Sequence, residues 1–317
     1  MEILKLNPVF KDYIWGGTRL RDEFHLKTDT DPVAEGWMLA CHKDGMNTVD
    51  GGENNGKTLQ QVLEENGSEK MLGENSKKFP YFPVLIKIID AKDNLSIQVH
   101  PDNDYARKVE NEYGKTEIWY VLDAEEGAQL IYGFKNSISK EEFRKAIESN
   151  TLPEVLNRVD VKKGDLFFIE AGTVHAIGKG TLIAEIQQNS NSTYRVYDYG
   201  RVGKDGKPRE LHIDKAVDVT VTEPPKYGTK PFGKPEELAG GKKQLLTQCD
   251  LFTVYRYDCE SKTELNAGSD SFHHLLIVDG NGKIDGRDFK KGDSFFVPAS
   301  YGEYTVEGRA EIVLTKI

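Results

Sequence analysis

Two histidines, a glutamate and a glutamine have the types and spacing that a metal site needs. Gln98 and His100 alternate along one short segment. Glu117 begins the next apolar segment, and His175 follows a turn of small residues. Neutral imidazoles, an amide oxygen and one carboxylate form a four-ligand set for a borderline divalent ion, with positions left for water or substrate. The spacing predicts one divalent-metal site from these four side chains. It leaves zinc, iron, manganese and cobalt open.

The segment around Gln98 and His100 also has a plainer interpretation. Residues 95–100 alternate between apolar and polar types, which predicts a strand with two unlike faces. The apolar face carries Leu95, Ile97 and Val99, and the polar face carries Ser96, Gln98 and His100. Such a strand commonly turns its polar face to solvent, so an exposed strand is the alternative. The glutamate and second histidine further along the chain favour the metal site.

These side chains must be held by β-strands. Short apolar segments between Gly, Asp and Asn turns predict a mainly β protein. The predicted strands are Val84–Ile89, Leu95–His100, Glu117–Leu122, Leu166–Ile169, Thr181–Ile186, Leu275–Val278, Ser294–Val297 and Glu311–Thr315. Helical patterns are few, and they cover Lys57–Glu65, Asp104–Glu112 and Ser139–Ile147. The last of these opens with a serine N-cap and acidic residues in its first turn.

One β-unit occurs twice. Residues 162–171 read KKGDLFFIEA and residues 290–299 read KKGDSFFVPA, and a similar strand ending precedes each copy. The repeat predicts two related β-barrels, one over residues 1–235 and one over residues 236–317. Between the copies, Thr222–Gly241 is rich in Pro, Gly and Lys and is expected to act as a linker or strap.

The two copies differ where chemistry would be expected. His175 stands eleven residues after the glycine of the first copy, and Glu303 holds the equivalent place in the second. The second copy has the neighbouring His273 and His274, whose side chains point to opposite faces of a strand and cannot both enter one barrel. We therefore expect the chemistry in the first barrel and a structural role for the second.

Bulk properties exclude several classes of protein. The 317 residues are enough for two domains with hydrophobic cores. A net charge of −10, without a long Lys/Arg cluster, argues against nucleic-acid binding but not against a small anionic substrate. No stretch approaches the roughly 20 apolar residues of a membrane span, and the N-terminus lacks signal-peptide features. Cys41, Cys249 and Cys259 predict reduced thiols of a cytoplasmic protein. The oligomeric state stays open, with a monomer as one option.

Two longer motifs resemble known families. Residues 164–175, GDLFFIEAGTVH, resemble the second signature of the cupin superfamily, with Glu170 where proline is usual. The first signature departs, because Gln-Val-His replaces the usual His-x-His and the glutamate lies further on. Residues 95–102, LSIQVHPD, followed by GKTE at 114–117, resemble the short bacterial form of type I phosphomannose isomerases. Further similar segments are Tyr13–Gly17, Ala34–Trp37, Pro83–Lys87 and Glu185–Arg195, so the resemblance covers essentially the whole chain.

The resemblance implies a fold and an activity. The fold would be two cupin-type β-barrel (jelly-roll) domains, with the helical insertion of longer members reduced to about residues 137–159. The activity would be a zinc-dependent aldose–ketose isomerisation of mannose 6-phosphate and fructose 6-phosphate, with one zinc ion per chain. The implied zinc ligands are the set already proposed, Gln98, His100, Glu117 and His175.

The resemblance also implies roles for five further residues. Lys87 and Ser96 match residues that the family assigns to the phosphate, and Arg195 matches its active-site arginine. Lys115 and Glu185 match polar residues that line the sugar pocket. The segment from 194 to 201 differs from the longer members, and this leaves the arginine at 201 as an alternative to Arg195.

These residue types suit the implied reaction. One proton must move from carbon 2 to carbon 1 through a cis-enediol, while charge develops on the two sugar oxygens. A divalent cation can hold those oxygens as a Lewis acid, and Arg195 can stabilise the enediolate. The proton carrier needs a pKa near neutrality. Glu185 has the polar parity of its strand, opposite Leu182, Ala184 and Ile186, and is preferred to Lys115 as the base.

Plainer interpretations and other functions remain as alternatives. Lys87 interrupts an apolar strand, where a lysine commonly snorkels or pairs with an acid. Arg195 and Glu185 could likewise belong to structural ion pairs. A cupin oxygenase using ferrous iron is a second functional class, although such sites favour a histidine-rich triad. A non-catalytic sugar-sensing paralogue is a third class, and the intact ligand set argues against it.

Overall fold

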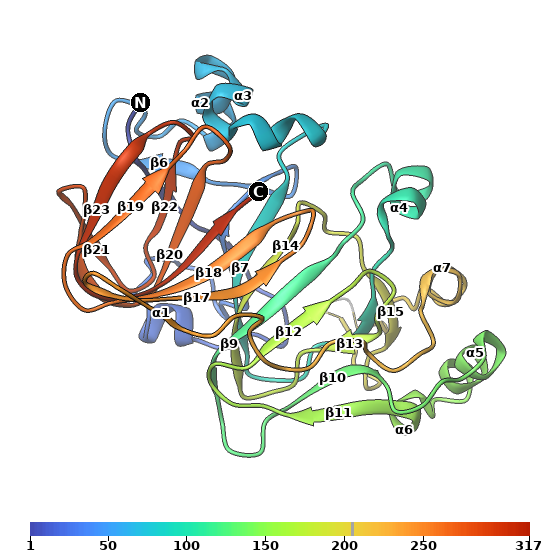
Figure 1. Ribbon diagram of the computed structural model, residues 1–317. Coiled ribbons are helices and arrows are strands. Elements are labelled where there is room, and N and C mark those ends of the chain that lie inside the picture. The colour runs from blue at the N-terminus through green and yellow to red at the C-terminus, as the bar shows by residue number, and fades with distance from the viewer. Residues whose placement is uncertain (204–205) are drawn as a thin grey trace.

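The computed structural model describes residues 1–203 and 206–317. The chain is mainly β, as predicted, and its larger sheets have ten, six and five strands (Figure 1). The ten-stranded sheet runs β16 (Glu236–Leu238), β17 (Gly241–Gln248), β18 (Thr253–Cys259), β23 (Gly302–Lys316), β20 (His273–Ile284), β22 (Ser294–Val297), β1 (Leu4–Asn7) and β6 (Thr48–Asp50). Off this path, β19 (Thr263–Ala267) pairs with β23, and β21 (Arg287–Lys290) pairs with β20.

Two smaller sheets build the other half of the molecule. The six-stranded sheet runs β12 (Leu166–Ile169), β9 (Glu117–Ala124), β14 (Thr181–Gln188), β7 (Val84–Ala91), β3 (Glu35–Leu39) and β2 (Val9–Lys11). The five-stranded sheet runs β11 (Leu156–Asp160), β10 (Gln129–Phe134), β13 (His175–Ala176), β8 (Ile97–Val99) and β15 (Tyr194–Tyr197). A small hairpin pairs β4 (Cys41–His42) with β5 (Gly45–Met46).

Helices are short and lie at the periphery (Figure 1). They are α1 (Arg19–Asp22), α2 (Leu59–Asn66), α3 (Ser68–Leu72), the 3-10 helix η1 (Glu74–Lys78), α4 (Asn103–Val109), α5 (Lys140–Glu148), α6 (Leu152–Val155) and α7 (Ile213–Val219). The predicted start of α5 is confirmed, because Ser139 and Glu142 form a capping box that satisfies free N–H groups of the first turn. Among the described residues, no helix has the length and apolar character needed to cross a bilayer.

The six-stranded sheet is buried on both faces, which explains its nearly continuous apolar strands. All eight residues of β7 and all eight of β14 are buried. Leu182, Ala184 and Ile186 pack into a core shared with the ten-stranded sheet. Ile183 packs on the other side, in a core shared with the five-stranded sheet. The predicted parity of β14 is therefore confirmed, and Glu185 shares the face of Ile183.

The start of β8 differs from the prediction. The strand begins at Ile97, so residues 94–96 are outside it. Ile97 and Val99 pack into one core cluster, whereas Leu95 packs into another. The Leu95 N–H donates to the Ile177 carbonyl at 2.9 Å. The predicted alternation from residue 95 was wrong at Leu95, because residues 94–96 precede the strand and do not keep its two-residue period.

The sequence repeat is also a structural repeat. Gly164 and Gly292 have φ values of +87° and +88°, which glycine adopts without a Cβ penalty. Asp165 and Asp293 each accept a hydrogen bond from the backbone N–H of the lysine three residues earlier, both at 3.0 Å. Each turn leads into a buried strand, β12 or β22. The pairings among the described strands nevertheless give open sheets, so two closed barrels are not confirmed.

Candidate metal centre

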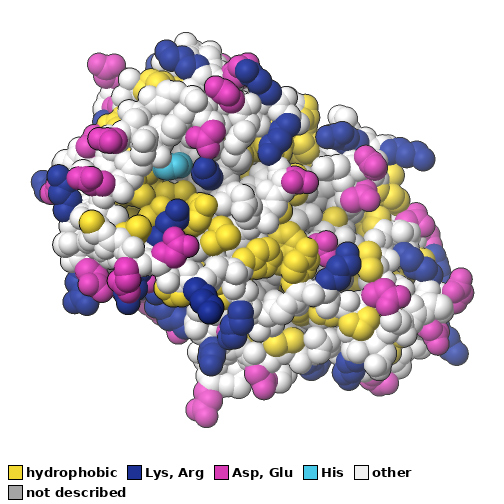
Figure 2. Space-filling view, in the orientation of Figure 1, with side chains coloured by type: hydrophobic (Ala, Val, Ile, Leu, Met, Phe, Trp, Pro, Cys, Tyr) yellow, Lys and Arg dark blue, Asp and Glu magenta, His cyan; other side chains and the backbone are white. Residues whose placement is uncertain are grey.

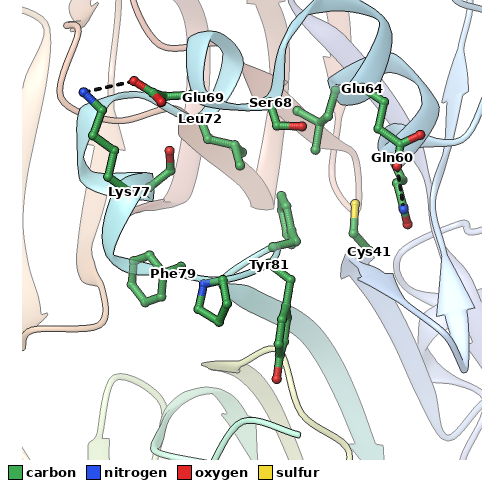
Figure 3. A pocket seen from close by; sticks show the side chains of 13 residues that line it. Cys41, Gln60, Glu64, Ser68, Glu69, Leu72, Lys77, Phe79 and Tyr81 are labelled. Atoms are coloured by element: carbon green, nitrogen blue, oxygen red, sulfur yellow. Dashed lines mark hydrogen bonds and ion pairs between the residues drawn. The ribbon is translucent and has the colours of Figure 1, made fainter.

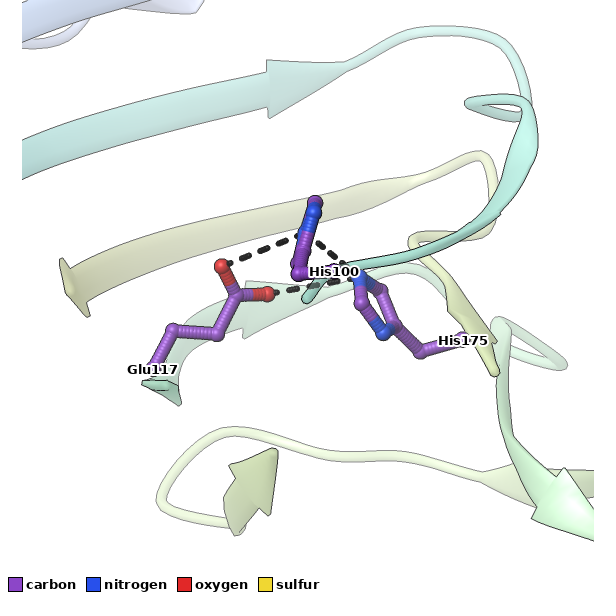
Figure 4. A group of neighbouring side chains, drawn as sticks. All are labelled: His100, Glu117 and His175. Carbon is purple, nitrogen blue, oxygen red and sulfur yellow. Dashed lines mark hydrogen bonds and ion pairs between the residues drawn. The ribbon is translucent and has the colours of Figure 1, made fainter. Parts of the chain in front are cut away.

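Three of the four predicted metal ligands converge in the interior (Figure 4). His100 follows β8, Glu117 begins β9 and His175 begins β13. The two Nε2 atoms of the histidines are 3.1 Å apart. They lie 3.7 Å and 3.5 Å from the two carboxylate oxygens of Glu117. All three residues are at most 1% exposed.

Backbone carbonyls orient both imidazoles. His100 Nδ1 lies 2.9 Å from the Ser192 carbonyl, and His175 Nδ1 lies 2.8 Å from the Thr173 carbonyl. A proton on each Nδ1 would donate to these oxygens and leave the Nε2 lone pairs facing the common centre. Burial, followed by the charge of Lys115, lowers the pKa of His175 to about 3 and that of His100 well below its usual value. Both rings are therefore neutral, the form that binds a metal.

The carboxylate of Glu117 has the character of a cation ligand. Both oxygens are buried, and neither accepts a hydrogen bond from a described residue. Lys115 Nζ lies 2.8 Å from one of them as an ion-pair partner. Burial, followed by the charge of Glu185, raises the pKa of Glu117. A buried carboxylate beside two neutral nitrogen donors fits a divalent cation.

Gln98 occupies the middle of the five-stranded sheet. It pairs in register with His175 on one side and with Arg195 on the other. Its side chain lines a cavity of about 210 Å³ next to the His–Glu–His group. That Gln98 is the fourth metal ligand stays a prediction.

The same cavity gathers the remaining predicted residues. Its lining includes the predicted Lys87, Ser96, Gln98, Lys115, Glu185 and Arg195. It also includes polar or aromatic residues that the sequence did not single out, namely Tyr13, Trp15, Glu35, Asn191, Thr193 and Arg209. Segments far apart in the chain therefore contribute to one pocket beside the candidate metal ligands.

Alternating charges run through the cavity wall. Lys87 Nζ lies 3.5 Å from Glu35 and 3.2 Å from Glu185, and Lys115 Nζ lies 3.7 Å from Glu185. The indole N–H of Trp119 donates to Glu185 at 2.9 Å. Burial opposes ionisation of Glu185, but the charges of Lys115 and Lys87 prevail and lower its pKa. Lys87 is only 4% exposed, so it pairs with acids and does not snorkel.

The structure separates the two candidate arginines. Arg195 lines the cavity, donates from Nη1 to the Glu210 carbonyl at 3.0 Å and has a buried Nε without a partner among the described residues. Arg201 does not line it, and instead donates to the Asn94 carbonyl and pairs with Asp198 at 2.6 Å. Of the two, only Arg195 lines the cavity, and its role in the reaction stays a prediction.

Another cavity is larger but has a different character. It measures about 420 Å³ and lies between α2, α3 and the segment through Tyr81, with the sulfur of Cys41 near it (Figure 3). None of the predicted site residues lines it. On the molecular face drawn in Figure 2, acidic and basic side chains are interspersed around apolar areas.

The histidines of the second repeat serve packing. His273 Nδ1 lies 2.8 Å from the Tyr304 hydroxyl, and His274 Nε2 lies 2.8 Å from the Ser294 hydroxyl. Tyr304 belongs to the inner core of the ten-stranded sheet, whereas Ser294 donates to the Met38 carbonyl of β3 in the six-stranded sheet. The two rings thus face opposite ways, as predicted. Glu303, at the position equivalent to His175, is exposed.

Comparisons with known proteins give a consistent result. The family model for the phosphomannose isomerase type I catalytic domain matches residues 3–131, and that for the mannose-6-phosphate isomerase cupin domain matches residues 242–317. A probable mannose-6-phosphate isomerase of Bacillus subtilis (strain 168), GmuF, is 40% identical over 98% of both chains. ManA, a mannose-6-phosphate isomerase of the same organism, is 38% identical over 100% of this chain and 99% of that one. A crystal structure of mannose 6-phosphate isomerase from Bacillus subtilis covers 100% of both chains, with a TM-score of 0.91 and 37% identity.

Proposed function

This chain belongs to the type I phosphomannose isomerase family, and we propose that it interconverts mannose 6-phosphate and fructose 6-phosphate with one bound metal ion. The observation that carries the proposal is the buried convergence of His100, Glu117 and His175 beside a polar cavity. Family membership gives no support to a ferrous oxygenase. The intact donor set argues against a non-catalytic paralogue.

The metal would be zinc, one ion per chain. Its ligands would be the Nε2 atoms of His100 and His175, the carboxylate of Glu117 and the amide oxygen of Gln98. The buried Glu117 carboxylate and the two facing nitrogens support this set. When bound, the ion would supply Lewis acidity to the sugar oxygens at carbons 1 and 2.

Glu185 would carry the proton between carbons 1 and 2. It lines the cavity, and its Oε1 lies 3.2 Å from the Lys87 ammonium. The hydrogen bond from Trp119 to its other oxygen fixes the carboxylate. The two neighbouring lysines keep it ionised, and by lowering its pKa they weaken it as a base, which counts against this role. Lys115 is the competing candidate, because its Nζ lies 3.2 Å from His100 Nε2 and lines the same cavity.

Three further residues would bind and stabilise the sugar. Arg195 would stabilise the enediolate, since its guanidinium lines the cavity and its strand pairs with that of Gln98. Ser96 and Lys87 would contribute to phosphate binding from the same wall. The positive charge of Lys87 is already shared with two carboxylates, which limits how much of a dianion it can match.

The domain organisation stays part of the proposal. Two cupin-type β-barrel (jelly-roll) domains, residues 1–235 and 236–317, are supported by the matching turns of the repeat and by the cupin-domain match at 242–317. The first would carry the helical excursion at about 137–159, where α5 and α6 lie. Strands β1 and β6 pair within the ten-stranded sheet, so the first 50 residues would serve both domains. The free cysteines support a cytoplasmic location.

A coupled isomerase assay tests the proposed function. Zinc-loaded protein is expected to convert mannose 6-phosphate into fructose 6-phosphate, and chelation is expected to abolish the conversion. The control is the same protein after chelation and reloading, which should recover its activity. Metal-replete, folded protein without turnover would refute the isomerase proposal.

A further inference from the structure

A short polar segment connects β14 with β15 beside the metal centre. Residues 189–193 read NSNST, and two of them, Asn191 and Thr193, line the cavity. The carbonyl of Ser192 lies 2.9 Å from Nδ1 of His100. The position of this segment therefore determines both a part of the cavity wall and the orientation of one predicted metal ligand.

Backbone hydrogen bonds hold only the first half of the segment. The Asn189 N–H donates to the Pro83 carbonyl at 3.0 Å, and the Ser190 N–H donates to the Gln188 carbonyl at 2.7 Å. Among the described residues, no backbone N–H of residues 191–193 donates to a backbone carbonyl. Because backbone polar groups do not fix the second half, side chains must do so.

Glu112 is the side chain that ties the serines of the segment together. Its Oε2 accepts hydrogen bonds from the Ser192 hydroxyl at 3.1 Å and from the Ser190 hydroxyl at 3.5 Å. The Ser190 hydroxyl also accepts from the backbone N–H of Ser192 at 3.2 Å. Lys43 forms an ion pair with the other carboxylate oxygen, and the Glu112 side chain is only 15% exposed. One charged acceptor therefore fixes Ser192 both directly and through its neighbour.

We propose that Glu112 is a positioning residue for the metal centre. Through Ser192 it fixes the ring of His100, whose Nε2 faces the common centre drawn in Figure 4. The assignment rests on the proposed metal binding and extends it to a carboxylate that does not line the cavity. Groups that orient a metal ligand typically contribute about 10- to 100-fold to metal affinity. Glu112 acts through an intervening residue, so we expect the lower end of that range.

Glu110 offers a matched comparison on the same stretch of chain. It accepts a hydrogen bond from the Tyr194 hydroxyl at 2.8 Å and pairs with Lys215 at 2.7 Å. Among the described residues, none of its hydrogen bonds or ion pairs reaches residues 189–193. Removal of the Glu110 carboxylate therefore breaks polar contacts of the same kinds without releasing Ser192.

The test measures the Kd of zinc by competition with a chelator. We expect this Kd to rise about 10-fold in Glu112→Ala and to be unchanged in Glu110→Ala. Ser192→Ala removes the hydroxyl but keeps the carbonyl, and it should give a similar rise. The double variant Glu112→Ala/Ser192→Ala should bind zinc no more weakly than the weaker single variant, because both changes break one connection. Glu112→Gln keeps an acceptor oxygen and should give a smaller rise than Glu112→Ala.

A second measurement follows the ring itself. Ring-nitrogen NMR of the metal-free protein should show the proton of His100 on Nδ1 in wild type and a mixture of tautomers in Glu112→Ala. A residue that only stabilises the fold would change neither this spectrum nor the zinc Kd of the folded protein.

Several outcomes would overturn the assignment. One is an unchanged zinc Kd in folded Glu112→Ala, and another is an equal rise in Glu110→Ala. If Glu112→Ala does not fold, a wild-type zinc Kd in Ser192→Ala overturns it. If wild type binds zinc without turnover, the isomerase proposal fails while the zinc Kd still decides the assignment. If wild type binds no zinc, the metal centre fails separately, and an identical His100 tautomer in wild type and Glu112→Ala then overturns the positioning role.

Discussion

Replacing Lys87 by methionine would leave two buried carboxylates facing an apolar side chain. In the wild-type protein the Lys87 ammonium lies 3.5 Å from Glu35 and 3.2 Å from Glu185. The side chains of the three residues are 5%, 9% and 4% exposed. Solvent therefore cannot replace the lost positive charge.

The magnitude follows from these distances and the burial. At an effective dielectric constant of about 20, each pair is worth about 5 kcal/mol of Coulomb energy. Desolvation of the buried ions offsets much of this, and removing one partner of a buried ion pair typically costs about 3–5 kcal/mol. We expect Lys87→Met to lose that amount of unfolding free energy near pH 8. The loss should shrink near pH 5, where a carboxyl group can take up a proton in place of the missing charge.

Urea unfolding followed by tryptophan fluorescence measures this effect, with unfolding free energies taken from the midpoints at a common m-value. The double variant Lys87→Met/Glu35→Gln removes one of the stranded charges. It should be more stable than the sum of the two single variants by about 1–3 kcal/mol, the coupling expected of contacting charges.

A simple outcome would refute this reasoning. If the unfolding free energy of Lys87→Met is within about 0.5 kcal/mol of the wild-type value, the usual range for surface substitutions, then the ammonium group of Lys87 does not stabilise the two carboxylates. A raised KM for mannose 6-phosphate with unchanged stability would then assign Lys87 to the phosphate alone.

His100→Ala and His175→Ala should each lose bound metal and isomerase activity, whereas His273→Ala should keep both. Metal analysis and the coupled assay measure these effects, and metal retained in the first two variants would contradict the prediction. Glu185→Gln should lower kcat by about 10²-fold or more with the metal retained, and a larger loss in Lys115→Met would transfer the proton-carrying role to that lysine. Burial lowers the pKa of His273 from 6.5 to about 4. Between these pH values the unfolded chain binds a proton that the folded protein does not. The unfolding free energy should therefore fall as pH decreases from about 6.5 to 4, by up to about 1.4 kcal/mol per pH unit. His273→Gln should flatten this dependence in denaturant titrations, and an unaltered slope would count against the buried, neutral ring.

The strands around the site were predictable because their residue patterns are local. The continuous apolar segments at 84–89 and 181–186 correspond to strands buried on both faces. The two-residue period of β14 correctly put Glu185 opposite Leu182, Ala184 and Ile186. The glycine–aspartate turns were repeated closely enough in sequence to predict equivalent turns in space.

Other parts of the site depend on contacts that no local pattern records. Glu35 on β3 pairs with Lys87 on the neighbouring strand β7. Arg209 lines the cavity from a polar segment in which apolar and polar residues do not alternate regularly. The pairing of β1 with β22 joins the two ends of the chain, which the repeat alone did not predict. Leu95 precedes the strand and donates a backbone hydrogen bond to Ile177, although the residue types alternate there. In each case a long-range partner determines the position of the side chain.

The most direct test is a metal titration of the metal-free protein, with bound zinc and turnover of mannose 6-phosphate measured on the same samples. The His–Glu–His group predicts that turnover rises in proportion to bound zinc and saturates at one ion per chain. His175→Ala, titrated in parallel, should bind no ion at this site and show no turnover. Full turnover in the metal-free protein, or equal metal binding and activity in His175→Ala, would contradict the proposed metal centre.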